Sequence, residues 1–282
     1  MARTKAISLL QAASTKADLA EIYGLVIENV RKETLSESLK SQSYTGDPAA
    51  GSVEYKRFVN SAAKAYGTAR TAHKGDAITA PPTTVNLDQH KEIVEECSQF
   101  DLDTFGVAGI MGRRASNHLD TLASELDTVF FATAGTAATA VTSTATTEAG
   151  KLEDAIVTLE TVKNDYVQGV PRSMIVAVAT PAYYSKIRTA LDSLPASNVD
   201  TAAEEFAMYH GVQVYSSVYM PTGIDVIVMA RGVVALPVVT YPYTEPEKIP
   251  LSNDYWSGLF FDYGAKALAP DMIFKINTPA GG

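Results

Sequence analysis

The chain has 282 residues, of which 46% are hydrophobic and 20% are charged. This composition excludes a wholly disordered chain and is typical of a globular protein with one large core or two modest ones. The single cysteine, Cys97, cannot form an intrachain disulfide, and we expect its thiol to be buried and inert. The fold must therefore hold without disulfides.

The net charge of -9 is divided unevenly along the chain. Residues 1–75 contain 11 Lys and Arg against 7 Asp and Glu, whereas residues 76–282 contain 12 against 25, which leaves +4 on the first part and -13 on the rest. Such a chain can attract copies of itself, although an acidic surface that only maintains solubility explains the same numbers. The acidic body argues against tight binding of nucleic acid, which requires many phosphate contacts from Lys and Arg.

The first residues include basic side chains but no apolar run that leads to a small-residue cleavage site, so no signal peptide is predicted. No apolar stretch approaches the roughly 18 residues that a membrane span requires. We therefore expect a protein that is made and assembled in the cytoplasm, without a membrane partner.

Residues 5–38 have the apolar spacing of a helix, clearest at Leu19, Ile22 and Val26, and predict one helix or a broken pair of helices. Residues 41–52 then concentrate Gly, Pro, Asp and Ser, which indicates a break. From 41 to 92 large apolar residues are scarce, and strand-like runs at 53–60 and 83–88 enclose a polar stretch. We predict a long hairpin or loop here. A mobile linker is the alternative, but a two-stranded hairpin is marginal alone, so we expect it to lie on a neighbouring subunit.

The next elements are a strand-like run at 91–100 and a helix at 113–131, whose leucines share one face. Residues 132–150, of which 14 of 19 are Ala or Thr, are predicted to form a loop and a domain boundary. An amphipathic helix at 152–166, a buried strand within 172–180 and a helix that starts at Pro181 follow. The remaining strands are expected within the ranges 211–217, 224–230, 231–239, 256–264 and 270–277. The fold class is mixed α+β.

No recognisable catalytic or cofactor motif is present. His118 falls among polar helix residues and His210 precedes a glycine, so exposed or capping roles are expected for both, as opposed to zinc ligation. Asp101/Asp103 and Glu95/Glu96 could bind a cation or act as acid and base, but solvated faces are the simpler interpretation. The glycines at 106, 109 and 112 indicate a flexible lead-in to the helix. We expect no enzyme activity, cofactor or metal.

Aromatic residues gather at Tyr183/Tyr184 and between 241 and 263. They could mark a ligand pocket, although a core or a subunit interface is the more ordinary place for aromatic side chains.

The order of three late stretches resembles the major capsid proteins of tailed bacteriophages, whose Hong Kong phage fold is shared with encapsulins. The stretches are LEDAIVTLETV with RSMIVAVATPAYYSKIRTAL, MYHGVQVYSSVYMPTGIDVIVMA, and GLFFDYGAKALAPDMIFKIN. The resemblance covers nearly the whole chain and places a spine helix at 106–132. It implies an N-terminal arm at 1–48, an extended loop at 49–92, a peripheral domain with the spine helix at 93–150, an axial domain at 151–240 and a return to the peripheral domain at 241–282.

The resemblance also implies a function. Many copies, as pentamers and hexamers, would form an icosahedral virion shell around double-stranded DNA without sequence-specific binding, together with a portal. A separate scaffolding protein is expected, because no additional N-terminal domain of the kind that some relatives use as a scaffold is seen. An encapsulin-type compartment is the alternative within the fold. A soluble α+β enzyme or ligand-binding protein with an unrecognised site is the alternative of another class.

Basic residues of the extended loop are the candidate contacts between subunits: Lys56, Arg57, Lys64, Arg70 and Lys74. We expect them to meet acidic residues of a neighbour at Glu92, Glu95, Glu96, Asp101 and Asp103.

Some relatives cross-link a loop lysine to an asparagine near the chain end with the help of a carboxylate. Lys64 or Lys74 and Asn253 could occupy those positions here. The carboxylate position, however, falls near Phe260 and Phe261, with Asp262 only adjacent. We therefore predict no covalent cross-links.

Overall fold

A computed structural model describes residues 2–72, 74–192, 208–244 and 246–278. The chain divides into two compact units, each built from three separate stretches. Unit 1 comprises residues 1–38, 86–127 and 237–264, and unit 2 comprises residues 39–85, 128–236 and 265–282. Both contain helices and strands, so the predicted α+β class is confirmed. The division into five segments stays a prediction.

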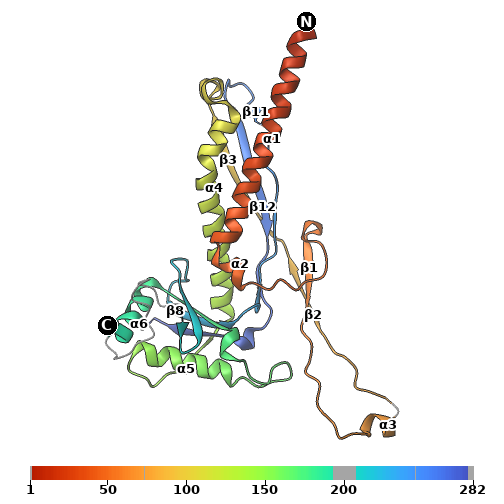
Figure 1. The fold of residues 1–282 in the computed structure, drawn as a ribbon, viewed down its shortest axis with the longest axis vertical. Helices are drawn as coiled ribbons and strands as arrows, with labels where there is room; N and C mark the ends of the chain where they lie inside the picture. Colours follow the sequence, from red (N-terminus) through yellow and green to blue (C-terminus); the bar gives the residue numbers. More distant parts are fainter. Residues whose placement is uncertain (1, 73, 193–207, 245, 279–282) are drawn as a thin grey trace. The chain divides into compact units, whose positions relative to one another are not determined.

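Unit 1 is organised around strand β12 (Figure 1). β12 (Tyr255–Tyr263) pairs antiparallel with β3 (Gln89–Cys97), β10 (Val238–Thr240) and β11 (Glu247–Lys248). The register with β3 is continuous from Tyr255 opposite Cys97 to Tyr263 opposite Gln89. One apolar core joins this sheet to the first and fourth helices; its buried members are Leu19, Met111, Tyr243 and Leu259.

The N-terminal helix is interrupted at Thr34, so of the two alternatives predicted for residues 5–38 the structure has the broken pair of helices. It forms α1 (Ala2–Glu33) and α2 (Leu35–Leu39). The backbone N–H groups of Leu35 and Ser36 begin α2 and donate to the buried Asp127 carboxylate at 3.2 and 2.9 Å. Because the first N–H groups of a helix have no partner within it, Asp127 supplies a cap from a distant part of the chain.

Helix α4 (Gln99–Ala137) includes the predicted helix at 113–131 and is longer at both ends. Its helical geometry is broken at Gly106, where φ is 69° and ψ is 162°. The prediction of a loop over 132–150 is wrong at both ends. α4 continues to Ala137, since alanine favours helix and Ala134 is buried. Helix α5 already begins at Glu148 with Thr147 as its cap.

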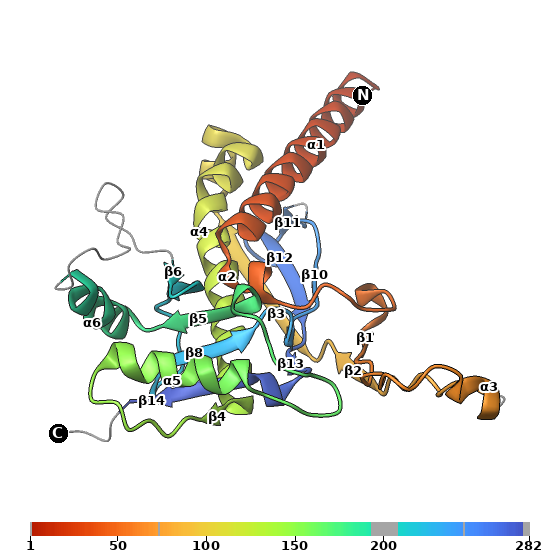
Figure 2. The same cartoon turned by 60° about the horizontal axis from the view of Figure 1, so that its bottom comes forward.

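Unit 2 contains a six-stranded sheet in the order β4-β14-β8-β5-β7-β6. The strands are β4 (Thr139–Ala140), β14 (Ile273–Asn277), β8 (Ile224–Ala230), β5 (Ile175–Ala179), β7 (Val212–Ser216) and β6 (Met208–Tyr209). Every residue of β5 is buried, as its apolar run predicted. Helix α5 (Glu148–Glu160) packs against β8 and β14, and α6 (Pro181–Asp192) packs against β7 (Figure 2).

The remaining elements of unit 2 are short. They are β1 (Ser52–Lys56), α3 (Thr68–Ala72), β2 (Pro82–Asn86), β9 (Val234–Ala235), β13 (Lys266–Ala267) and the 3-10 turns Pro48–Ala50, Arg172–Met174 and Pro270–Met272. β1 pairs with β2, and β9 pairs with β13. Val53, Tyr55, Val85 and Ala235 form a small core under these strands.

One glycine of unit 1 is required by a close backbone approach. A Cβ atom on Gly264, directly after β12, would lie 1.9 Å from the carbonyl oxygen of Asn86. A backbone atom cannot move aside as a side-chain terminus can, so any larger residue at this position must displace the main chain.

Candidate functional site

The 57–81 loop runs from the end of β1 to the start of β2 and carries α3 (Figure 1). Val59 N–H donates to the Thr79 carbonyl at 2.9 Å and joins the two arms of the loop near their base. Beyond this point large apolar side chains face solvent: Tyr66 is 95% exposed and Ile78 is 87% exposed. Apolar side chains displayed in this way are typical of a surface that binds another molecule.

Four of the five predicted contact residues lie on or beside this loop with exposed side chains. Lys64 pairs with Asp76 at 2.5 Å, and the Arg70 guanidinium lies 5.8 Å from the centre of the Tyr66 ring. Lys56 and Lys74 are exposed. Contacts of these residues with other copies of the chain stay a prediction.

The fifth residue, Arg57, is bound by its own chain at the base of the loop. Its two terminal nitrogens donate to the two carboxylate oxygens of Asp271 at 2.6 and 2.7 Å. Asn164 Nδ2 donates to the same carboxylate at 2.5 Å, and the Tyr166 ring centre lies 4.4 Å from the guanidinium carbon. Burial raises the pKa of Asp271, but the hydrogen bonds from Arg57 and Asn164 outweigh it and hold this pKa below its ordinary value.

Sequence reasoning missed the partners of Arg57. Asp271 stands 214 residues away along the chain. The residues around Asn164 were predicted to belong to a helix at 152–166, but α5 ends at Glu160 and Asn164 lies in the turn beyond it. No local pattern connects the two segments.

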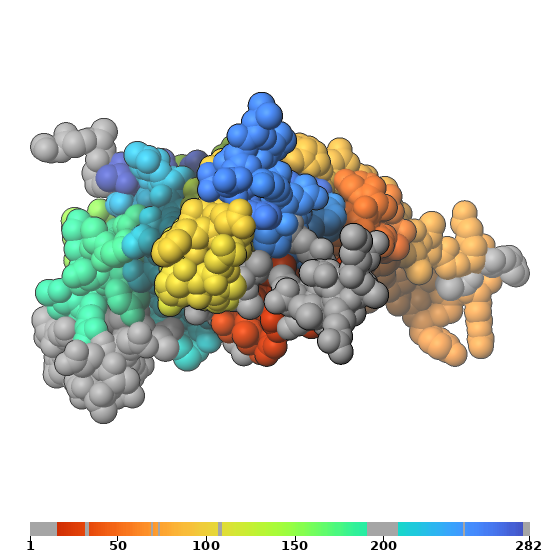
Figure 3. Space-filling model, turned by 90° about the horizontal axis from the view of Figure 1, so that it is seen from above, coloured from red at the N-terminus to blue at the C-terminus, as the bar shows by residue number. Residues whose placement is uncertain are grey.

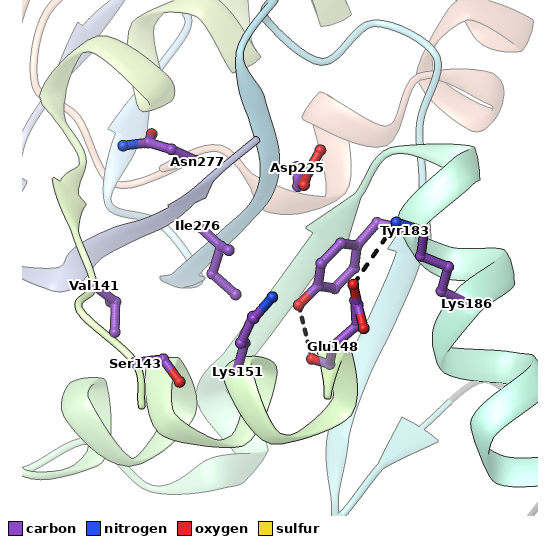
Figure 4. A pocket seen from close by; sticks show the side chains of 9 residues that line it. All are labelled: Val141, Ser143, Glu148, Lys151, Tyr183, Lys186, Asp225, Ile276 and Asn277. Carbon is purple, nitrogen blue, oxygen red and sulfur yellow. Dashed lines mark hydrogen bonds and ion pairs between the residues drawn. The ribbon is translucent and has the colours of Figure 1, made fainter. Parts of the chain in front are cut away.

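A cavity of about 210 Å³ opens near the start of α5 (Figure 4). Tyr183 Oη donates to the Glu148 carbonyl at 2.7 Å, and Lys186 Nζ lies 3.7 Å from the Glu148 carboxylate. Burial raises the pKa of Tyr183 well above its ordinary value, so its hydroxyl stays protonated. Lys151 and Asp225 also line the cavity. The lining mixes charges of both signs, and among the described residues no cluster of His, Cys, Asp and Glu is suited to a metal ion.

Comparison with known proteins decides the family. A family model described as phage capsid protein matches residues 98–276, well over half of the chain. This chain belongs to the phage capsid protein family. It is a shell-forming capsid protein of the virion, and its family is a structural one.

Solved structures confirm the fold. A chain from Mycobacterium phage Che8 is 17% identical with a TM-score of 0.60, over 84% of this chain and 93% of that one. The capsid of cyanophage P-SCSP1u gives 15% identity and a TM-score of 0.62, over 86% and 88%. A virus-like particle from Pyrococcus furiosus gives 11% identity and a TM-score of 0.56, over 91% of this chain and 98% of that one. No curated protein matches the sequence significantly. The likeness shows the fold of Hong Kong phage type capsids.

The acidic residues expected to meet the basic loop lie in unit 1 of this capsid protein. Glu92, Glu96, Asp101 and Asp103 are exposed. Glu95 is different, because its carboxylate accepts from Arg114 Nε at 2.8 Å and lies 3.1 Å from His118 Nε2. The hydrogen bond from Arg114 is the largest cause that holds the pKa of Glu95 below its ordinary value. Glu95 is thus already neutralised within the chain.

His118 corrects an expectation from the sequence. The prediction of an exposed or capping role is wrong, because its side chain is fully buried and its Nδ1 lies 2.8 Å from Tyr243 Oη. Because histidine is polar, the sequence did not indicate that His118 lies on the buried face of α4. His210 is exposed, as predicted, and lies 3.1 Å from Glu153.

Cys97 is half-buried, and the prediction of a buried thiol was too strong. Burial, and then the charges of Glu95 and Asp101, raise its pKa. A raised pKa means less thiolate, which agrees with an unreactive sulfur.

The aromatic residues divide between core and surface. Tyr183, Tyr243, Phe261 and Tyr263 are buried, whereas Tyr241 is 43% exposed. Four of these nine aromatic residues therefore belong to the cores of the two units.

The residues named for a cross-link have other contacts. Asn253 Oδ1 accepts from Lys248 Nζ at 3.2 Å. The Asp262 carboxylate lies 2.7 Å from His90 Nδ1 and accepts from Tyr241 Oη at 2.9 Å. The absence of cross-links stays a prediction, and a ladder of multimers that survives boiling in SDS would contradict it.

A second exposed apolar region lies on unit 1. Figure 3 shows the first turns of α4 in yellow beside the blue chain around β11 and β12. Phe100 is 76% exposed, and Leu251 is fully exposed. Among the described residues, no helix has the length and apolar character needed to cross a membrane.

Proposed function

We propose that this protein is the major capsid protein of a tailed bacteriophage. Many copies, arranged as pentamers and hexamers, would form the icosahedral head that encloses double-stranded DNA. One observation carries the proposal beyond family membership: the 57–81 loop displays apolar and basic side chains that its own chain leaves exposed. Repetition over many copies turns weak contacts of this kind into a stable shell.

The partners of the proposed shell are other copies of the chain, a portal and a separate scaffolding protein. The last two rest on the resemblance alone. DNA would be enclosed without sequence-specific recognition, since the chain carries a net charge of -9. We also propose that the protein has no catalytic role and binds no cofactor, because its sequence contains no recognisable catalytic motif.

The contact residues are proposed to act electrostatically. The exposed Lys56, Lys64, Arg70 and Lys74 would meet acidic side chains of a neighbour, and salt would weaken such exposed contacts first. Arg57 is already bound to Asp271 of its own chain, so it would contribute to these contacts without touching the neighbour.

Electron microscopy of the purified protein, with light scattering, tests this proposal. We expect closed shells, or rings of five or six subunits, from the wild-type chain. The double variant Arg70→Glu/Lys74→Glu should reduce the yield of particles at least about tenfold, because like charges would then face each other. The matched control is Lys163→Glu/Lys248→Glu, which changes the net charge equally at exposed positions outside the loop. Normal assembly of the loop variant would contradict the proposed contacts.

An encapsulin-type compartment is the second candidate, favoured by the match to the Pyrococcus furiosus particle over 98% of that chain. The contents of purified particles separate the two. Phage heads would contain double-stranded DNA that resists nuclease, whereas a compartment would contain a protein cargo.

A further inference from the structure

The start of the 57–81 loop is held by its own chain through several contacts at once. The turn that follows α5 lies beside this start in Figure 2. Asn60 N–H donates to the Asp165 carbonyl at 2.8 Å, next to the contacts of Arg57 with Asp271 and Tyr166. We call this set, with Asn164, the loop anchor. It ties the loop to residues that lie roughly a hundred and two hundred positions further along the chain.

The loop anchor differs from an ordinary surface ion pair. The side chains of Arg57 and Asp271 are 24% and 31% exposed, compared with 50% and 63% for Lys64 and Asp76. The Arg57 contact is bidentate, which fixes orientation as well as distance. The hydrogen bond from Asn164 and the Tyr166 ring restrict the two partners further. Lysine could not reproduce this geometry, because its ammonium is a point charge on a flexible stem.

We propose that Arg57 is a positioning residue for assembly, which sets the direction in which the 57–81 loop leaves β1 before a neighbouring copy binds. The inference rests on the proposed function, since it assumes that this loop contacts a neighbour. A loop already held in its binding direction loses less conformational entropy on association than a freely swinging one. Arg57 thus promotes assembly without touching the neighbour.

Hydrogen exchange on the full chain, diluted until light scattering detects no particles, tests the first half of the proposal. Arg57→Ala should accelerate exchange of the Asn60 amide about tenfold, because local opening of the loop base becomes easier. Arg57→Lys should give an intermediate rate. Lys64→Ala is the matched control, since it removes an ion pair of the same loop away from its base. Amides of β5 should keep their protection in every variant, which confirms that unit 2 is folded.

Assembly of the same variants tests the second half. We expect at least a fivefold lower yield of closed particles for Arg57→Ala and partial recovery for Arg57→Lys. The double variant Arg57→Asp/Asp271→Arg, which reverses the pair, should recover more of the yield than either of its single changes. This recovery would not occur if Arg57 contacted an acidic residue of a neighbour.

The possible results separate the proposal from the function on which it rests. Unchanged exchange at Asn60 in Arg57→Ala, or faster exchange with an unchanged yield, would overturn the positioning role. Failure of the charge reversal to restore assembly would also overturn it in favour of a direct contact. If the wild-type chain forms no particles under any condition, the proposed function fails, and the role of Arg57 in assembly fails with it. Faster exchange at Asn60 would then still assign the anchoring of the loop to Arg57.

Discussion

Unit 2 contains two regions of opposite character, the sheet around β5 and the 57–81 loop. All five residues of β5 are at most 1% exposed, whereas Tyr66 and Ile78 of the loop are 95% and 87% exposed. The side chains of β5 are buried within one chain, whereas the chain leaves the apolar side chains of Tyr66 and Ile78 exposed. The difference predicts that folding and assembly depend on separate sets of residues. Substitutions in the sheet should change the free energy of unfolding, and substitutions in the loop should change association.

The largest expected effect comes from a charge in the sheet. Val178→Asp would place a carboxylate where the native side chain has no exposure, at a cost of more than about 4 kcal/mol. We expect loss of the cooperative unfolding transition in circular dichroism and accumulation of insoluble protein. Ile78→Asp, the same change at an 87% exposed position, is the control and should keep the wild-type transition. A folded Val178→Asp protein would refute this account of the sheet.

A smaller effect is expected where Arg172 connects α5 to the sheet region. Its guanidinium contacts Glu153 at 2.6 Å and Glu160 at 2.9 Å, and it also donates to the His210 carbonyl at 3.2 Å. Arg172→Ala should lower the free energy of unfolding by about 1–2 kcal/mol, measured by urea denaturation. Lys186→Ala, which removes a more exposed contact, should cost at most about 0.5 kcal/mol.

The same network predicts a dependence on pH. Burial raises the pKa of Glu153, but hydrogen bonds from Arg172 and His210 outweigh it, and the net pKa lies below the ordinary 4.5. Its contribution to stability is therefore complete above that pH and is lost as the pH falls below it. The stability difference between wild type and Arg172→Ala should shrink in acid. A constant difference from pH 7 to pH 3 would contradict this cause.

The smallest effect on stability is expected in the loop. Tyr66→Ser/Ile78→Ser should change the free energy of unfolding of unassembled protein by less than about 0.5 kcal/mol, because neither side chain is buried. The yield of particles in electron microscopy should nevertheless fall several-fold, since the apolar area available to a neighbour is smaller. A large loss of stability would show that the loop packs on its own chain and would remove the contrast with the sheet.

Several elements could be predicted from the sequence because their signals are local. The apolar run of β5 and the proline at the start of α6 each identify one element without knowledge of the rest. The extent of α4 could not be predicted in the same way. Its Ala- and Thr-rich end has no amphipathic pattern, and the burial of Phe131 and Ala134 decides its conformation.

The candidate site was predicted only in part, for a physical reason. Basic composition and scarce core residues identified the exposed loop. The contact of Arg57 with Asp271 depends on segments that the fold brings together over 214 residues. The prediction for His118 was wrong for a similar reason, because its residue type suggests exposure to water, whereas the fold buries its imidazole beside Tyr243 and Glu95.

The close approach at Gly264 restricts which nucleotide changes the gene can tolerate at this codon. With 1.9 Å between the Asn86 oxygen and the first carbon of any side chain, no other amino acid fits without moving the backbone. Every glycine codon shares its first two nucleotides, so each single-nucleotide change there would be expected to harm the protein, and each change of the third would be silent. Residues on the surface of the capsid protein can be substituted more freely, whereas the codon of Gly264 can change only at its third nucleotide.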